Sequence, residues 1–141
     1  GVLTINNTGA TEENVGIVCA NKGFLTETHL ERVGINPNSN FVIAGAMDEY
    51  DCPEFDNLWD HEKRPEVPEA HYDKAEADMI RVCKEFCKKH PNIGAIVLEC
   101  TGMQPFARAI QRELDLPIFS WGTLLDYAYS AVVHRDYYGH V

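Results

Sequence analysis

Four short apolar runs, separated by helical patterns, constrain the fold of this sequence more than any other feature. The runs cover 15–20, 41–46, 95–99 and 117–121. Each is too short for a typical helix and nearly free of charge, as strands buried on both faces are. Alternating strands and helices favour right-handed crossovers and a parallel sheet covered on both sides. We therefore predict an α/β three-layer sandwich, flavodoxin- or Rossmann-like, with a four-stranded parallel sheet in the order 2-1-3-4.

Sequence signals also place the helices between these runs. Thr28 begins a capping-box pattern ahead of a short helix. Apolar residues recur at three- and four-residue steps over 70–90, which predicts a long amphipathic helix. Pro105 suits the first turn of a third helix, because its missing N–H needs no partner there. Thr123 is expected to cap the last helix, over 124–133.

Length and composition favour one ordinary domain. The chain has 141 residues, of which 45% are hydrophobic. We assign 15–141 to the α/β domain and 1–14 to an extra amino-terminal strand or linker. The first residue is not methionine, so we expect a processed chain or a piece of a longer one. No apolar run approaches the roughly 18 residues of a membrane span, and the start lacks signal-peptide features, which predicts a cytoplasmic protein.

Charge narrows the range of partners. The net charge of −10 argues against nucleic acid or an anionic membrane as a partner, because both need clustered Lys and Arg. A small anionic substrate remains compatible, since oriented backbone amides set the local field of a pocket. Much of the acid lies in 48–70, which we interpret as a solvated surface loop.

The sequence has five cysteines and no features of a secreted protein, so we predict reduced thiols and not disulfides. Cys83 and Cys87 lie on the apolar stripe of the long helix and are expected to pack in the core. Cys52 is expected to be an exposed thiol. The histidines show no metal-binding spacing, so we predict no metal site. The sequence also lacks a GxGxxG motif and a P-loop, which removes the simplest nucleotide-binding interpretation.

Cys100 is the candidate catalytic residue. The stretch GAIVLECTGMQPFARAIQ ends a strand at this thiol and begins a helix directly afterwards. Amides at a helix start lower a cysteine pKa and favour the reactive thiolate. Thr101 offers a hydroxyl, and Gly102 allows close backbone approach to a ligand. Cys19 should lie beside Cys100, at the switch point where such sheets bind ligands. The alternative is that Cys100 is a small buried hydrophobe.

Two stretches resemble the aspartate/glutamate racemase superfamily. One is GAIVLECTGMQPFARAIQRELDLPIFSWGTLLDYAYSAV, with its Glu-Cys-Thr core and Leu-Pro-Ile-Phe strand; the other is VGIVCANKGFLTETHLERVGI. The resemblance covers 15–133 and corresponds to the carboxyl-terminal half of those proteins. It implies a racemase-like enzyme of two similar α/β halves that uses no pyridoxal phosphate or other cofactor. One cysteine from each half faces the substrate's α-carbon, and the two thiols exchange its proton.

By this resemblance, Cys100 is the catalytic cysteine of this half and Thr101 helps to bind the substrate carboxylate. We expect Gly102, Cys19 and Asn21 to line the same substrate site. The expected substrate is aspartate or a related small acid. The amino-terminal half with the second cysteine is absent, and Asn21 is followed by lysine where the family's Asn-Cys-Gly motif has its thiol. We therefore expect either a homodimer or a missing amino-terminal half.

Two alternatives stay open. A single cysteine could donate a proton from one side, as in the related arylmalonate decarboxylases, without a second thiol. The chain could also be a binding or interaction module that keeps the fold and has lost the reaction. An exposed cluster of tyrosines near the carboxyl end, Tyr127, Tyr129, Tyr137 and Tyr138, would suit such an interaction.

Overall fold

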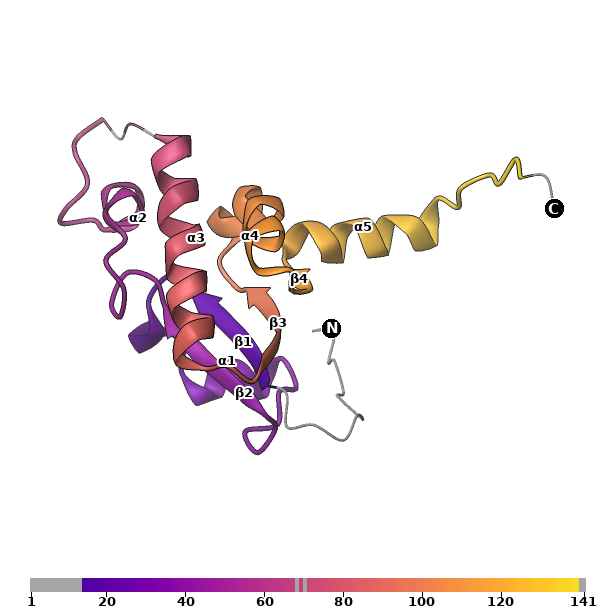
Figure 1. Cartoon of the computed structure of the whole chain (residues 1–141), viewed down its shortest axis with the longest axis horizontal. Helices are drawn as coiled ribbons and strands as arrows, with labels where there is room; N and C mark the ends of the chain where they lie inside the picture. Colours follow the sequence, from indigo (N-terminus) through magenta and orange to yellow (C-terminus); the bar gives the residue numbers. More distant parts are fainter. Residues whose placement is uncertain (1–13, 68, 70, 140–141) are drawn as a thin grey trace.

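The protein is described by a computed structural model that covers residues 14–67, 69 and 71–139. Its centre is a four-stranded sheet in the order β2-β1-β3-β4, and every pair of neighbouring strands is parallel. Figure 1 shows β1, β2 and β3 side by side, with α3 running along them. The predicted fold class and strand order are confirmed. The strands are β1 (Asn14–Cys19), β2 (Phe41–Gly45), β3 (Ile93–Leu98) and β4 (Ile118–Phe119).

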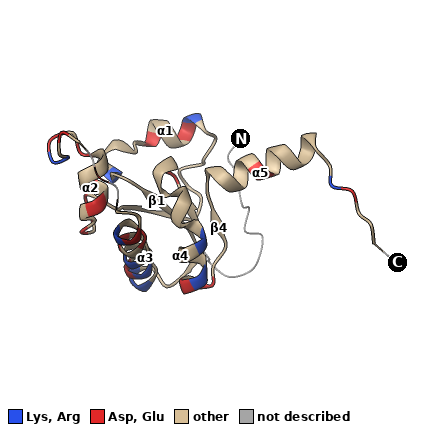
Figure 2. Ribbon diagram, turned by 90° about the horizontal axis from the view of Figure 1, so that it is seen from above, with Lys and Arg blue, Asp and Glu red and all other residues tan. Residues whose placement is uncertain are grey.

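Helices flank this sheet on both sides. Figure 2 shows α3 and α4 along one face and α1 along the other. The long α3 begins at Tyr72, close to the predicted start. The helical segments are η1 (Lys22–Phe24), α1 (Glu27–Arg32), α2 (Pro53–Trp59), α3 (Tyr72–Lys89), η2 (Thr101–Phe106), α4 (Ala107–Leu114) and α5 (Trp121–Val132), where η marks a 3-10 helix.

The core forms where the apolar stripe of α3 meets the sheet. Met79, Cys83 and Phe86 are fully buried, as the helical periodicity predicts. Close packing explains one glycine of β1: a Cβ added at Gly16 would lie 2.9 Å from Cε1 of Phe86. A larger residue at this position would push α3 away from the sheet.

The segment 48–70 differs most from its prediction as a solvated loop. It contains α2, which starts with Pro53 in its first turn. Phe55 is fully buried, and Cys52, predicted to be exposed, is 1% exposed. The prediction was wrong because Cys52, Glu54 and Phe55 are buried at the start of α2, while most other charged side chains of this segment stay exposed.

Helix starts also differ from prediction by a few residues. Thr26 caps α1 in place of Thr28, with His29 completing the capping box. Ser120 caps α5, and Thr123, the third residue of the helix, completes the capping box. Pro105 lies inside η2, so the predicted third helix opens as a 3-10 turn before α4. Each difference shifts a boundary and leaves the element in place.

The carboxyl-terminal helix α5 projects away from the sheet (Figure 1). Within α5 no residue is buried, and Leu125, Tyr127 and Tyr129 are exposed. Asp126 is the only acidic residue in the sequence of α5. The predicted amino-terminal strand or linker lies outside the described residues, apart from Asn14, which belongs to β1. Among the described helices, none is long and apolar enough to span a bilayer.

Candidate functional site

The two cysteines singled out from the sequence lie at the same edge of the sheet. Cys19 is the last residue of β1, and Cys100 follows β3, the neighbouring strand. The N–H of Glu99 donates to the carbonyl oxygen of Val18 at 2.9 Å, which fixes the two strand ends against each other. This is the carboxyl edge of the central strands, where parallel sheets bind their ligands.

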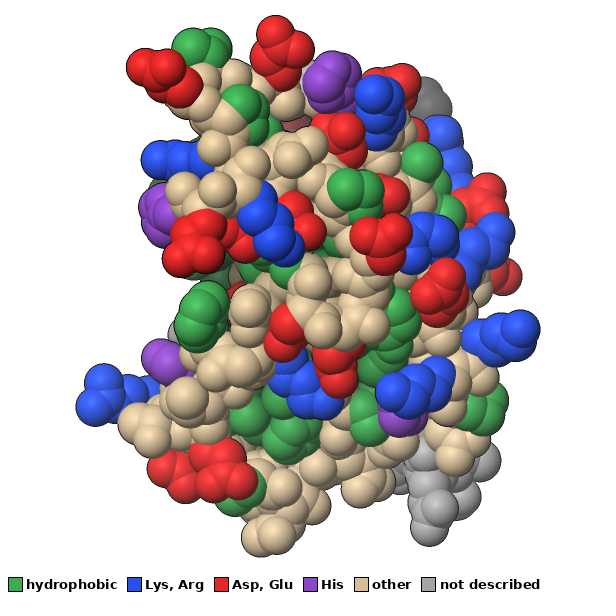
Figure 3. All heavy atoms as spheres, turned by 90° about the vertical axis from the view of Figure 1, so that its left-hand side faces the viewer, with side chains coloured by type: hydrophobic (Ala, Val, Ile, Leu, Met, Phe, Trp, Pro, Cys, Tyr) green, Lys and Arg blue, Asp and Glu red, His purple; other side chains and the backbone are tan. Residues whose placement is uncertain are grey.

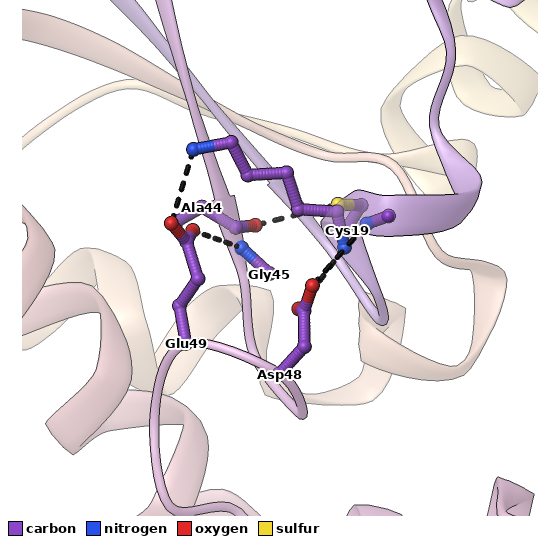
Figure 4. A network of polar contacts seen from close by, with 7 residues as sticks. Cys19, Ala44, Gly45, Asp48 and Glu49 are labelled. Carbon is purple, nitrogen blue, oxygen red and sulfur yellow. Dashed lines mark hydrogen bonds and ion pairs between the residues drawn. The ribbon is translucent and has the colours of Figure 1, made fainter.

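Cys19 faces into the structure. Its Sγ donates a hydrogen bond to the carbonyl oxygen of Ala44 at 3.4 Å, and the residue is 2% exposed (Figure 4). Burial, together with the carboxylates of Glu99 and Asp48, raises the pKa of Cys19 to about 12. Cys19 was predicted to contact substrate. The structure instead assigns it to the packing between β1 and β2, because its thiol is sealed and stays protonated.

The turn after β1 is closed by carboxylates of the chain itself. Asp48 accepts hydrogen bonds from the N–H groups of Lys22 at 3.0 Å and Gly23 at 3.2 Å (Figure 4). Glu49 accepts from the N–H of Gly45 at 2.9 Å and from Lys22 Nζ at 3.0 Å. These backbone amides are therefore already hydrogen-bonded to carboxylates of the protein itself. Asn21, predicted to bind substrate, precedes this turn as a half-buried residue whose side chain caps no amide.

Cys100 is half-buried and caps the 3-10 turn η2. Burial raises the pKa of Cys100, the nearby Glu99 carboxylate adds to this effect, and the amides of Gly102 and Met103 oppose it. The predicted amide contribution is therefore present, but the predicted net lowering is wrong, because burial outweighs two amides. A thiol of this kind is protonated at rest and becomes a stronger base once deprotonated.

Thr101 and Gly102 extend the site from Cys100. Thr101 is exposed, so its hydroxyl can reach a ligand. Gly102 lies under the indole of Trp59: a Cβ added at Gly102 would be 2.3 Å from Cζ2 of Trp59. Gly102 was predicted to allow close approach of a ligand; in the structure the side chain that approaches it closely is Trp59, so ligand contact at Gly102 stays a prediction.

An aromatic cluster flanks this turn, and sequence reasoning missed it. Trp59 stacks on Phe55 with ring centroids 4.9 Å apart, and Phe55 meets Phe106 of η2 edge-on at 6.1 Å. Tyr72 of α3 packs on Phe106 at 5.1 Å, and its hydroxyl donates to the carbonyl oxygen of Pro105 at 3.1 Å. The available signal was the spacing of Phe55 and Trp59 after a helix-starting proline.

Gln104 joins the turn η2 to the start of α5. Its Oε1 accepts a hydrogen bond from Ser120 Oγ at 2.8 Å and another from the N–H of Gly122. The position of α5 is thereby linked to the turn that carries Cys100. Across the described residues, no three His, Cys, Asp or Glu side chains come together as potential metal ligands.

Comparison with known proteins gives two partial similarities. No protein-family model matches the chain. Dimethylsulfoniopropionate lyase 5 of Emiliania huxleyi (strain CCMP1516) is 30% identical over 61 residues, which is 43% of this chain and 12% of that protein. A dimethylsulfoniopropionate lyase of Durusdinium sp. clade D is 29% identical over 66 residues, 47% of this chain and 19% of that protein. The matched stretch spans less than a fifth of either lyase.

Proposed function

We propose that Cys100 moves a proton at the α-carbon of a small carboxylic acid, in an enzyme of the aspartate/glutamate racemase type. The observation that carries this proposal is the position of Cys100: a half-buried thiol just beyond the carboxyl end of the central strand β3, at the start of the 3-10 turn η2. Thr101 is the side chain best placed beside it to bind the substrate carboxylate.

We infer that the reaction is a β-elimination, with dimethylsulfoniopropionate as the substrate. The Cys100 thiolate takes the proton from the α-carbon, the C–H electrons form the α,β double bond, and the bond from the β-carbon to sulfur breaks. The products are acrylate and neutral dimethyl sulfide, and the cysteine carries the proton. Two observations support this reaction: the partial similarity to two lyases named for this substrate, and the sealed thiol of Cys19.

A β-elimination needs only one base, and Cys100 is the one half-buried thiol at this edge of the sheet. A racemase must also return a proton to the opposite face of the α-carbon, which requires a second group there. Cys19 is buried and bonded to Ala44, and Cys100 is the half-buried thiol at the same sheet edge. The raised pKa of Cys100 makes its thiolate a stronger base and also leaves less thiolate at neutral pH, so these two effects on the rate of proton removal oppose each other.

Racemisation of aspartate is the second candidate, and the Glu99-Cys100-Thr101 motif supports it. In this case a second α/β half supplies the opposite base, either from a longer chain or from a second copy of this one. The exposed apolar side chains of α5 form a surface against which such a second half could pack. We place either enzyme in the cytoplasm, because all five cysteines are free thiols.

Product analysis separates the two candidates. The purified chain is incubated with dimethylsulfoniopropionate in one sample and with L-aspartate in another, and NMR follows acrylate and D-aspartate. We expect acrylate with the wild type and none with Cys100→Ser. Cys87→Ser is the matched control, because Cys87 is the other half-buried thiol and lies on α3. Acrylate at the wild-type rate with Cys100→Ser would reject the proposal, and D-aspartate without acrylate would favour racemisation.

A further inference from the structure

The inference concerns the partly exposed indole beside Cys100. Trp59 is 41% exposed although it stacks on Phe55 and lies against Gly102. Both tryptophans of the chain are partly exposed, and Trp59 differs from Trp121 in lying against Gly102, close to Cys100 in the sequence. Gly102 is two residues from Cys100, so their Cα atoms are at most about 7.6 Å apart. A partly exposed aromatic side chain therefore lies against the turn that carries Cys100.

The charges around this indole favour a positive ligand. Asp56 and Asp60 lie on either side of Trp59 in the sequence and share one cation, Lys63, at 3.1 and 3.7 Å from its Nζ. Two carboxylates and one ammonium leave a net negative charge at this end of α2. Figure 3, which looks onto the α2 and α3 side of the molecule, shows acidic side chains interspersed with basic ones. Cations bind to the faces of aromatic rings, and tryptophan binds them best.

We propose that Trp59 binds the cationic end of the substrate, a sulfonium or quaternary ammonium group, and thereby orients the α-carbon toward Cys100. This inference rests on the proposed function, because Cys100 defines where the α-carbon must lie. In dimethylsulfoniopropionate the sulfonium is separated from the α-carbon by one carbon. The proposal therefore requires the exposed part of the indole and the Cys100 thiol to lie within one substrate length of each other. Trp59 is then a specificity-determining residue that distinguishes cationic acids from neutral ones.

The test compares two ligands of the same shape. Dimethylsulfoniopropionate carries the sulfonium, and 4-methylpentanoate has a neutral CH group in its place. Binding is measured by calorimetry in the Cys100→Ser background, where the proposed reaction cannot consume the ligand. We expect the protein to prefer the sulfonium by about fivefold or more. Trp59→Leu should abolish this preference while 4-methylpentanoate binds within about twofold of its original affinity.

Controls separate the cation site from packing effects. Tyr129→Leu removes an exposed aromatic ring on α5 and should keep the preference. Trp59→Phe retains the stack on Phe55 with a weaker ring and should keep part of the preference, which covers the case that Trp59→Leu does not fold. No binding of dimethylsulfoniopropionate at millimolar concentration, or an unchanged preference in both Trp59 variants, would overturn the proposal.

The binding measurement tests the cation site and the activity measurement tests the elimination, so each proposal can be rejected without the other. Loss of preference in Trp59→Leu together with no acrylate from the wild type would keep the cation site and reject the elimination. Acrylate from the wild type together with an unchanged preference in Trp59→Leu would keep the elimination and reject Trp59 as the cation-binding residue.

Discussion

The Sγ atom of Cys19 donates a hydrogen bond across the sheet to the carbonyl oxygen of Ala44, at 3.4 Å. This contact distinguishes Cys19, at the end of β1, from Cys100, which follows the neighbouring strand β3. Cys19 is held between β1 and β2 with a pKa of about 12, whereas Cys100 is half-buried, and the amides of Gly102 and Met103 only partly oppose the rise in its pKa that burial causes. The site therefore offers one accessible thiol at this sheet edge.

Alkylation should reveal this difference directly. We expect iodoacetamide to modify the half-buried thiols, Cys87 and Cys100, well before the buried Cys19, Cys52 and Cys83. In a Cys87→Ser background, modification of Cys100 should accelerate as the pH rises past the ordinary cysteine value of 9.0, because burial raises its pKa. Peptide mass spectrometry measures both effects. Modification of Cys19 at the rate of Cys100 would contradict the assignment.

Stability should fall at alkaline pH because three thiols are buried. Burial raises the pKa of Cys19, Cys52 and Cys83 to about 12, from 9.0 for an ordinary cysteine. The folded state holds these protons longer than the unfolded state, so their contribution is complete below about pH 9 and is lost as the pH rises toward 12. Urea unfolding at pH 8 and pH 10 should show a smaller decrease for Cys83→Ala than for the wild type. Equal decreases would rule out this thiol as a source of the effect.

The sequence predicts the sheet well and the walls of the site poorly. Strand order follows from short apolar runs alternating with helices, and the position of Cys100 follows from the run that it ends. The contact between Trp59 and Gly102 depends on α2, whose charged composition hid the buried Phe55 and the partly exposed Trp59 that stacks on it. The direction of the pKa shift of Cys100 depends mainly on burial by residues that are distant in the sequence. The sequence itself identifies only the neighbouring amides, which lower the pKa. Tertiary burial accounts for both differences.

Gly102→Ala tests the contact with Trp59. An added Cβ would lie 2.3 Å from Cζ2 of Trp59, so the indole must move off the turn and out of its stack on Phe55. We expect a loss of about 1–3 kcal/mol in the free energy of unfolding and a change in Trp59 fluorescence in a Trp121→Phe background. Gly139→Ala is the matched control, because nothing lies within 4 Å of its Cβ. If Gly102→Ala behaves like Gly139→Ala, the indole does not cover this turn.

The exposed surface of α5 should bind hydrophobic dyes. Leu125 is exposed and no residue within α5 is buried, so Leu125→Glu should reduce dye fluorescence while changing the free energy of unfolding by less than about 0.5 kcal/mol. Ser130→Glu adds the same charge to the same helix without removing an apolar side chain, and should leave dye binding nearly unchanged. A large loss of stability in Leu125→Glu would mean that α5 packs against the domain.

Hydrogen exchange at the α-carbon is the most direct test of the role proposed for Cys100. Dimethylsulfoniopropionate and L-aspartate are each incubated with the chain in deuterated water, and mass spectrometry measures deuterium at the α-carbon of the recovered acid and deuterium in any product. We predict that the wild type and Cys87→Ser incorporate deuterium into at least one acid or convert it to product, and that Cys100→Ser does neither. Equal incorporation by Cys100→Ser and the wild type would contradict the account.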